Sequence, residues 1–287
     1  MQIKLLAVLG VLGSLSFSVV QAQDAFENTK ISSQRLNESV YMLTGMGGNI
    51  GVSAGEDGIL IIDDQYAPLA DKIAVAIGDI SKAKMKYVVN THYHGDHTGS
   101  NAYFSEVQNT TIFAHENVRS RLQADKEVKA SALPVVTFAD GITFHFNGET
   151  IKVSHMPAGH TDSDSVIWFE KANVLHAGDL FFEGRFPYID LDGGGTVAGY
   201  IKNVQSLIAM LNDDTQIIPG HGKLASKADY QMVLNMLVET AEYVKTKKAQ
   251  GVSLGDLTKA GLGDKWKSWS WQFINEEKWI STLYKGQ

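Results

Sequence analysis

A dense cluster of side chains that bind metal ions lies between positions 92 and 97, in the run His-Tyr-His-Gly-Asp-His. An extended backbone directs His92 and His94 to the same side. Gly95 lets the chain turn, so that Asp96 and His97 approach from a second direction. Imidazole and carboxylate groups are ligands for zinc and similar divalent ions, and a catalytic zinc keeps an open position for water. The run therefore predicts a catalytic metal site rather than a polar surface loop.

Three short motifs with further histidines and aspartates follow the cluster. They are Gly-His-Thr-Asp-Ser-Asp at 159–164, His-Ala-Gly-Asp at 176–179 and Pro-Gly-His-Gly at 219–222. Together with the His-x-His-x-Asp-His run after a strand, these motifs resemble the signature of the metallo-β-lactamase superfamily, in the family's order. The resemblance extends from about Val40 to Gly222. It implies an αβ/βα four-layer metallo-β-lactamase sandwich.

The resemblance implies a centre of two metal ions, expected to be two zinc ions (Zn2+) per chain. The ligands would be His92, His94 and His160 for one ion, Asp96, His97 and His221 for the other, and Asp179 as the bridge between them. Two divalent ions that share a carboxylate can hold a water, lower its pKa towards neutrality and polarise a carbonyl oxygen. Asp96 is the candidate catalytic residue, because it would steer the bridging hydroxide and relay a proton to the leaving group.

The absence of cysteine narrows the substrate class. Zinc β-lactamases of the largest subclass place a cysteine where this chain places Asp179. An aspartate there is typical of glyoxalase II, of acyl-homoserine lactonases and of many exported hydrolases. We expect an exported zinc-dependent hydrolase that cleaves a C(=O)–N, C(=O)–O or C(=O)–S bond in a β-lactam, lactone, ester or thioester. The alternatives are an iron-dependent oxidoreductase on the same scaffold and a glyoxalase II-like thioesterase.

Several other side chains near these motifs have two interpretations. We expect His115, His145 and His155 to be non-ligands, and His176 to pack behind the site. Asp162 and Asp164 either orient a ligand imidazole or form a turn, and Tyr93 is expected to point away from the metals. Arg185 either pairs with a substrate carboxylate at the rim of the cleft or is structural. A set of C-terminal aromatic residues is expected mainly to be core, with an apolar wall of the substrate cleft as the alternative: Trp266, Trp269, Trp271, Phe273 and Trp279.

The elements that must position these residues alternate between strands and helices, which favours the α/β class. Strands are expected at 39–44, 49–54, 59–63, 85–90, 143–146, 150–155, 165–169 and 174–177. Helices are expected at 67–80, 115–126, 197–211, 227–250 and 272–284. The sequence shows no linker and no internal repeat, so we expect residues 23–287 to form a single domain with C-terminal helices.

The first 22 residues have the pattern of a secretory signal peptide. Lys4 precedes an apolar run from Leu5 to Val20, and a small residue, Ala22, offers a cleavage site. We therefore expect a periplasmic or secreted protein with no membrane anchor after cleavage. The 287-residue chain has a net charge of −7, which argues against nucleic-acid binding. The expected partner is a small-molecule substrate, and the sequence does not specify an oligomeric state.

Overall fold

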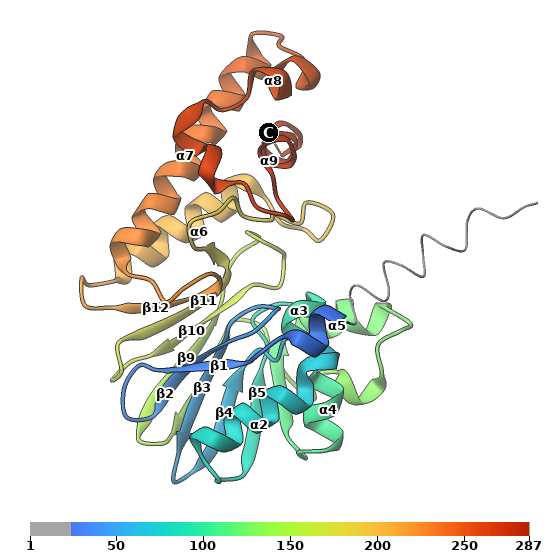
Figure 1. Ribbon diagram of the computed structural model, residues 1–287, viewed down its shortest axis with the longest axis vertical. Helices are drawn as coiled ribbons and strands as arrows, with labels where there is room; N and C mark the ends of the chain where they lie inside the picture. The colour runs from blue at the N-terminus through green and yellow to red at the C-terminus, as the bar shows by residue number, and fades with distance from the viewer. Residues whose placement is uncertain (1–23, 287) are drawn as a thin grey trace, which may run out of the picture.

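Two β-sheets face each other and carry helices on their outer sides (Figure 1). The structure is a computed structural model that describes residues 24–286, so the expected signal peptide, residues 1–22, lies outside the described residues. This arrangement confirms the predicted α/β class and the αβ/βα four-layer sandwich. No helix of the described chain combines the length and the apolar character that a membrane span requires.

The first sheet has seven strands among the described residues, in the order of the sequence. These strands are β1 Ser32–Arg35, β2 Val40–Thr44, β3 Ile50–Gly55, β4 Gly58–Ile62, β5 Met85–Val89, β6 Thr111–His115 and β7 Val136–Phe138. Strands β1 to β4 pair in antiparallel fashion, and β4 to β7 pair in parallel. The parallel half matters for the site, because the carboxyl ends of β4 and β5 meet at the same edge.

The second sheet has five strands in the described chain, in the order β12-β11-β10-β9-β8. Their bounds are β8 Gly141–Phe146, β9 Glu149–His155, β10 Ser165–Phe169, β11 Val174–Phe182 and β12 Gln216–His221. Only β11 and β12 pair in parallel here, and their register shifts after His176 and again after Gly178. Strand β11 is therefore irregular where the predicted bridging aspartate lies.

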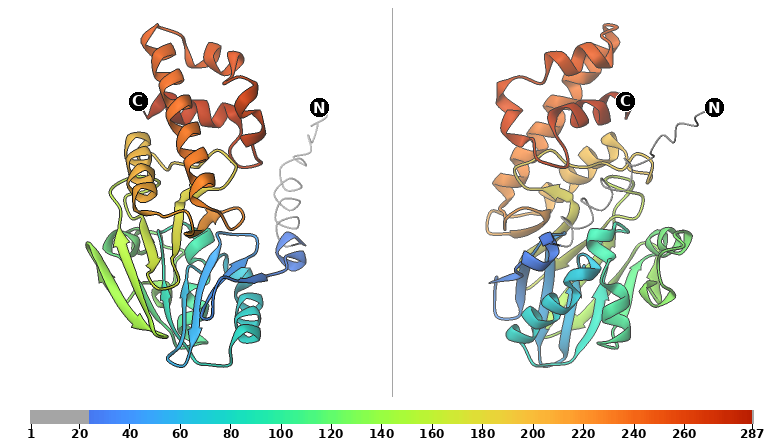
Figure 2. Two further views of the ribbon diagram at one scale, coloured as in Figure 1. Left: turned by 90° about the vertical axis from the view of Figure 1, so that its left-hand side faces the viewer. Right: turned by 45° about the vertical axis from the view of Figure 1, so that its right-hand side comes forward.

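Helices cover both outer faces of the pair of sheets. They are η1 Ala67–Leu69, α2 Ala70–Ile80, α3 Gly95–Thr98, α4 Asn101–Glu106, α5 Glu116–Ala124, η2 Ala130–Ala132, α6 Val197–Met210, α7 Lys227–Ala249, α8 Leu254–Ala260, η3 Asp264–Trp269 and α9 Glu276–Lys285. Helices α7 to α9 gather beyond the end of the sheets near which α3 lies (Figures 1 and 2). The predicted helix at 272–284 begins four residues late, because the side chain of Asn275 caps α9 by accepting the N–H of Lys278.

The apolar side chains of the strands divide between the two faces of each sheet. In β4, Leu60 and Ile62 pack between the sheets, whereas Ile59 and Ile61 pack under α2. Both faces of β4 are therefore buried, which explains its unbroken apolar sequence. Because every residue of this strand is anchored, its carboxyl end is a rigid base for the residues that follow.

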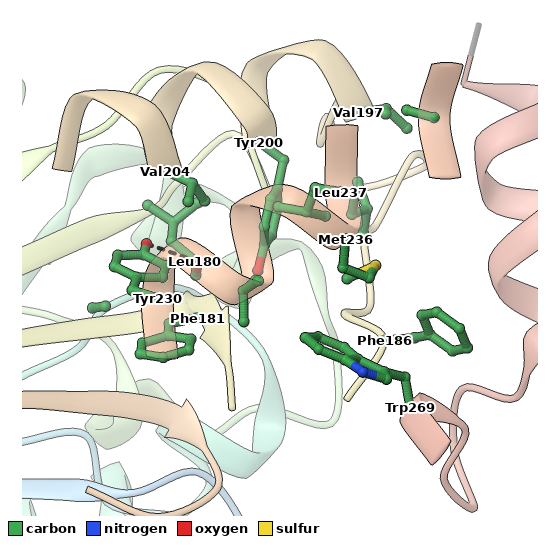
Figure 3. Packing of buried hydrophobic residues seen from close by; sticks show 14 of the residues in the cluster. Leu180, Phe181, Phe186, Val197, Tyr200, Val204, Tyr230, Met236, Leu237 and Trp269 are labelled. Carbon is green, nitrogen blue, oxygen red and sulfur yellow. Dashed lines mark hydrogen bonds between the residues drawn. The ribbon is translucent and has the colours of Figure 1, made fainter. Parts of the chain in front are cut away.

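The outer face of the second sheet packs against α6, α7 and the C-terminal segment, as Figure 3 shows for part of this core. Tyr200 of α6 and Tyr230 of α7 are fully buried there. The Tyr200 hydroxyl donates to the Asp179 carbonyl at 2.9 Å, and the Tyr230 hydroxyl donates to the Leu180 carbonyl at 2.9 Å. Two helices thus hold the irregular backbone of β11.

Candidate metal centre

The structure brings all seven candidate ligands together at one edge of the sandwich, in two adjoining groups. The first group is His92, His94, His160 and Asp179, and the second is Asp96, His97 and His221. Within each group the ligand atoms lie within 4.8 Å of one another. Residues up to 129 positions apart in the chain, from His92 to His221, therefore meet in one place.

In the first group three ring nitrogens converge on one point. The Nδ1 atom of His94 lies 2.9 Å from Nε2 of His160 and 3.1 Å from Nε2 of His92. Lone pairs of neutral imidazoles repel at such distances unless a proton or a cation lies between them. The arrangement is the one expected of three ligands that face a shared positive ion.

The outer nitrogen of each of these three rings has a hydrogen-bond partner. His94 Nε2 lies 3.0 Å from Oδ2 of Asp190, and His160 Nδ1 lies 2.8 Å from the carbonyl of Tyr188. His92 Nδ1 lies 3.0 Å from the hydroxyl of Thr91. An outer N–H that donates to an oxygen leaves the inner nitrogen with its lone pair, which is the tautomer that binds a metal.

In the second group the imidazoles of His97 and His221 face the carboxylate of Asp96. Oδ2 of Asp96 lies 3.2 Å from Nε2 of His221 and 3.7 Å from Nε2 of His97. The outer nitrogen of His97 is 2.7 Å from Oδ2 of Asp63, a fully buried carboxylate. This group offers two imidazole nitrogens and one carboxylate oxygen, so it has fewer imidazoles than the first group.

Asp179 lies between the two groups and presents one oxygen to each. Its Oδ1 atom is 3.1 Å from Nε2 of His97 and 3.4 Å from Nε2 of His221. Its Oδ2 atom is 3.4 Å from Nε2 of His160 and 3.8 Å from Nε2 of His92. A carboxylate with this geometry can bind two ions at once.

Short backbone segments at strand ends place the ligands. Strand β5 ends at Val89, and α3 begins at Gly95 with His94 as its N-cap residue. The backbone therefore changes from extended to helical within the cluster, and His92 and His94 approach the centre from a different direction than Asp96 and His97. In β11, Gly178 has a φ of +52°, and a Cβ there would lie 2.9 Å from the Thr91 Cβ. A glycine is needed at this position both for the backbone conformation and for the close approach of the two strand ends.

The charges of the cluster shift its pKa values in a consistent way. Burial alone would raise the pKa of Asp179, but the imidazoles of His97, His221 and His160 outweigh it and hold that pKa well below the usual value. Burial lowers the pKa of His160 to about 4. Burial would also lower the pKa of His221, but the Asp179 and Asp96 carboxylates raise it to about 9. The Asp179 carboxylate is thus ionised, as metal binding would require.

Two buried polar atoms of the centre indicate whether its residues fit metal ions. His97 Nε2 and Asp179 Oδ1 are buried and have no hydrogen-bond partner in the described structure. An unsatisfied buried nitrogen and carboxylate oxygen are costly in free energy, and a cation between them would satisfy both. The donor set of imidazoles and carboxylates also suits divalent zinc. The residues present therefore fit a pair of metal ions.

Two carboxylates behind the ligands, Asp63 and Asp190, were not singled out by the sequence. Asp63 also accepts the Thr91 backbone N–H and hydroxyl, each at 2.7 Å. Asp190 accepts the hydroxyl of Tyr93, the residue between two ligands, in addition to the imidazole of His94. Asp63 directly follows the apolar strand β4, and a carboxylate at the end of a buried strand is the only feature of the sequence that could have indicated its role. Asp190 lies in a loop, where the sequence gives no equivalent signal.

The remaining polar residues near the motifs lie outside the two groups. His115 caps α5 by accepting the Asn117 N–H, and its ring stacks on His155 at a centroid distance of 3.7 Å. His176 is buried behind the centre, with Nε2 3.1 Å from the Asn49 carbonyl. Asp164 accepts the His160 backbone N–H at 2.7 Å and so closes a turn.

A cleft of about 840 Å³ opens above the metal centre. Its walls include the ligands His94, Asp96, Asp179 and His221, and also Arg185, Tyr188, Trp271 and Phe273. Trp266, Trp269 and Trp279 are buried in the core. The expectation that the C-terminal aromatic residues are core is therefore right for these three tryptophans and wrong for Trp271 and Phe273.

Comparisons with known proteins agree with the fold. The Metallo-beta-lactamase superfamily profile matches residues 44–221. An uncharacterised protein of Aquifex aeolicus (strain VF5) is 32% identical over 184 residues, which cover 60% of this chain and 83% of that protein. The metallo-beta-lactamase type 2 of Bacteroides fragilis is 23% identical over 224 residues, which cover 74% of this chain and 88% of that enzyme. The solved structure of a metallo-beta-lactamase from Pontibacter korlensis aligns with a TM-score of 0.63 and 19% identity, and covers 72% of this chain and 99% of that chain. The protein belongs to the metallo-β-lactamase superfamily.

Proposed function

We propose that this protein is an exported hydrolase that binds two zinc ions and cleaves a C(=O)–N, C(=O)–O or C(=O)–S bond of a small molecule. The observation that carries the proposal is the position of Asp179, whose two oxygens face two separate groups of ligands. One ion would be held by three imidazoles and the other by Asp96, His97 and His221. The relatives named as metallo-beta-lactamases support hydrolysis as the reaction class.

Bound divalent ions would supply an activated water and would polarise the carbonyl oxygen of the substrate. The residues of the chain have complementary roles. Asp179 keeps the two ions together by neutralising part of their charge. Asp63 and Asp190 fix the rings of His97 and His94, so that their inner nitrogens stay in position. The binding geometry is thus set before the substrate enters.

Asp96 is the residue placed to move a proton. Its side chain lines the cleft, and its Oδ2 lies 3.2 Å from Nε2 of His221. Burial would raise the pKa of Asp96, but the imidazole of His97 and the hydrogen bond from His221 outweigh it and lower that pKa. Asp96 is therefore ionised and can accept a proton from the attacking water and pass it to the leaving group.

The proposed activity is tested by the metal content and by three substrates of different bond type. Protein purified without added metal is analysed for zinc and iron, and is then assayed on nitrocefin, an N-acyl-homoserine lactone and S-lactoylglutathione. The proposal expects zinc in the protein and zinc-dependent turnover of at least one of the three. Iron in place of zinc, together with no hydrolysis of any of them, would contradict it and would favour an oxidoreductase.

Export is part of the proposal and has its own test. The apolar run that follows Lys4 supports a signal peptide. Expressed with its own N-terminus in a Gram-negative host, the protein should be released by osmotic shock, with Gln23 or a close neighbour as its first residue. Retention of Met1 on the released enzyme would contradict the proposal.

A further inference from the structure

The chain beyond the family-matched range returns to the metal centre. The match to the family ends at residue 221, and residues after it form α7 to α9 and the segment Ser270–Ile274 between them. Trp271 and Phe273 of this segment line the same cleft as the ligands Asp96 and His221. The C-terminal part of this chain therefore contributes directly to the site at which a substrate would bind.

The segment is fixed on both sides, so its side chains are held in place. The indole N–H of Trp271 donates to the Phe186 carbonyl at 2.8 Å, and the Phe186 N–H donates to the Trp269 carbonyl at 2.9 Å. Trp269, which precedes the segment, and Ile274, its last residue, are both buried. A wall that is ordered without a ligand loses little conformational entropy when a ligand binds.

The aromatic rings form a continuous surface that starts at a metal ligand. The ring of His221 stacks on Phe182 at a centroid distance of 5.0 Å and lies 6.2 Å from Trp271. Phe273 lies 5.7 Å from Trp271 and 5.4 Å from Tyr188. Phe273 is 50% exposed where it lines the cleft, and Trp271 and Tyr188 are partly buried. Aromatic rings that line a cleft offer a flat apolar surface to a ligand.

Arg185 adds a positive charge to this surface. Its guanidinium lies 5.2 Å from the centre of the Trp271 ring, and its Nε–H donates to the Glu183 carbonyl at 3.3 Å. Within the described chain no carboxylate lies within 4.0 Å of it, whereas Arg121, in another part of the molecule, forms two hydrogen bonds with Asp162. A guanidinium that lies over an indole and has no carboxylate partner is suited to bind an anionic group.

We propose that Arg185, Tyr188, Trp271 and Phe273 form a recognition wall for substrates that combine an aromatic group with an anionic group, such as a carboxylate, close to the bond that is cleaved. This inference rests on the proposed function, since it names the substrate class of that site. The wall predicts weak recognition of uncharged substrates with purely aliphatic chains, such as alkanoyl homoserine lactones. In this proposal the four residues of the wall determine which substrates bind, and they take no part in the reaction itself.

Binding of three probes to the metal-loaded protein tests the wall without any turnover. The probes are naphthalene-2-sulfonate, 2-naphthylmethanol and cyclohexanesulfonate, and affinity is measured by calorimetry. A sulfonate is used because it is a poor metal ligand, so it reports on Arg185 rather than on the metals. We expect naphthalene-2-sulfonate to bind about tenfold more tightly than either of the other two, because only it satisfies both the rings and the guanidinium.

Substitutions separate the two parts of the wall. Arg185→Gln should remove the advantage of naphthalene-2-sulfonate over 2-naphthylmethanol and leave the affinity for the alcohol unchanged. Phe273→Ala and Trp271→Ala should weaken both naphthyl probes several-fold. Phe273 is half exposed, so its substitution leaves the core intact even if the tryptophan variant fails to fold. Arg35→Gln on β1 and Met210→Ala on α6 are the matched controls for loss of an exposed arginine and of an exposed apolar side chain.

The outcomes distinguish this inference from the proposed function. Sulfonate binding that is unchanged in Arg185→Gln, or naphthyl binding that is unchanged in Phe273→Ala, would overturn the wall even if the enzyme hydrolyses substrates normally. Probe binding as expected in a protein that hydrolyses nothing would support the wall and overturn the proposed reaction. Equal losses in the control variants would also overturn the wall.

Discussion

At the scale of single residues, the ligand imidazoles are oriented from behind by buried oxygens. The carboxylate of Asp63 fixes His97, and that of Asp190 fixes His94. Such outer partners set the tautomer and the direction of a ring, and their loss typically lowers metal affinity by about 10- to 100-fold. The precision of the centre thus depends on residues that would not touch a metal.

Substitution of Asp63 should therefore affect one ion more than the other. Asp63→Asn keeps the shape of the side chain but removes the charge that faces His97, so affinity for the ion at Asp96, His97 and His221 should fall about 10- to 100-fold. Zinc titration against a chelating dye measures the two affinities. Asp190→Asn is the matched variant, and it should weaken the ion at the three imidazoles instead. The same loss at the same ion in both variants would contradict these roles.

The two groups of ligands should also differ in their response to pH. In the metal-free protein the pKa of His160 is about 4, so its imidazole is already neutral at pH 7. The pKa of His221 is about 9, and the Asp179, Asp96 and Asp63 carboxylates hold the pKa of His97 well above its usual value against the effect of burial, so both imidazoles must lose a proton before they can bind an ion. Affinity for the second ion should therefore rise steeply with pH from pH 6 towards 9, by about 10- to 100-fold per pH unit with proton release, and much more steeply than affinity for the first ion. Calorimetric titrations at several pH values measure both, and parallel slopes would contradict the assignment.

At the scale of elements, the irregular register of β11 decides where the Asp179 carboxylate lies. The hydroxyl of Tyr200 holds the Asp179 carbonyl, and that of Tyr230 holds the next carbonyl along the strand. A Cβ at Gly220 on the neighbouring β12 would lie only 2.0 Å from Oδ1 of Asp179. Strands β11 and β12 and helices α6 and α7 together therefore restrict the Asp179 carboxylate to one position.

Loss of the Tyr200 hydroxyl should affect both stability and metal binding. Tyr200→Phe leaves the Asp179 carbonyl without its donor, which costs about 1 kcal/mol of the free energy of unfolding and lets the carboxylate move. The midpoint of thermal unfolding should fall by a few degrees, and the second zinc should be held more weakly. Tyr230→Phe is the control, because it loses an equivalent hydrogen bond one residue further on. If the two variants retain zinc equally well, Tyr200 does not position the bridge.

The sequence predicted most of these elements where apolar residues carried the pattern, but it missed β6, whose last four residues are buried. The sequence predicts strand β10 with its observed bounds because Val166, Ile167 and Phe169 form an apolar run, and the structure buries all three. Strand β1 was missed because its sequence, Ser-Ser-Gln-Arg, is polar and exposed, so pairing with β2 alone creates it. The ligand motifs could be predicted from residue types, and a place for Trp271 in the wall of the cleft was the alternative role given to the C-terminal aromatic residues. The role of Asp190 could not be predicted, because it arises from a loop that only the folded chain brings to His94.

At the scale of the whole molecule, the metal centre joins the two halves of the sandwich. His92, His94, Asp96 and His97 follow the first sheet, whereas His160, Asp179 and His221 belong to the second sheet and its loops. Ions bound between the halves would therefore act as cross-links that exist only in the folded state. Their binding free energy adds to the free energy of unfolding.

Removal of the metal should lower stability without unfolding the chain at room temperature, because the hydrophobic clusters between and around the sheets do not depend on the ions. With zinc at about a thousand times both dissociation constants, each of the two ions adds about 4 kcal/mol, so chelation of both should lower the midpoint of thermal unfolding by about 20 °C. Differential scanning calorimetry with and without a chelator measures the change. Addition of zinc should restore the original midpoint, and a midpoint that does not respond to either treatment would contradict a metal that bridges the halves.

The central claim, that Asp179 joins two metal ions, is tested most directly by the zinc content of the wild-type protein and of Asp179→Asn, measured side by side by mass spectrometry. The amide keeps the shape of the side chain but removes the charge that both ions would share. The ion held by fewer imidazoles should then be lost first. We expect two zinc ions per wild-type chain and about one per variant chain, with catalytic efficiency lower by about two to four orders of magnitude. Two zinc ions and near-normal turnover in Asp179→Asn would contradict the account.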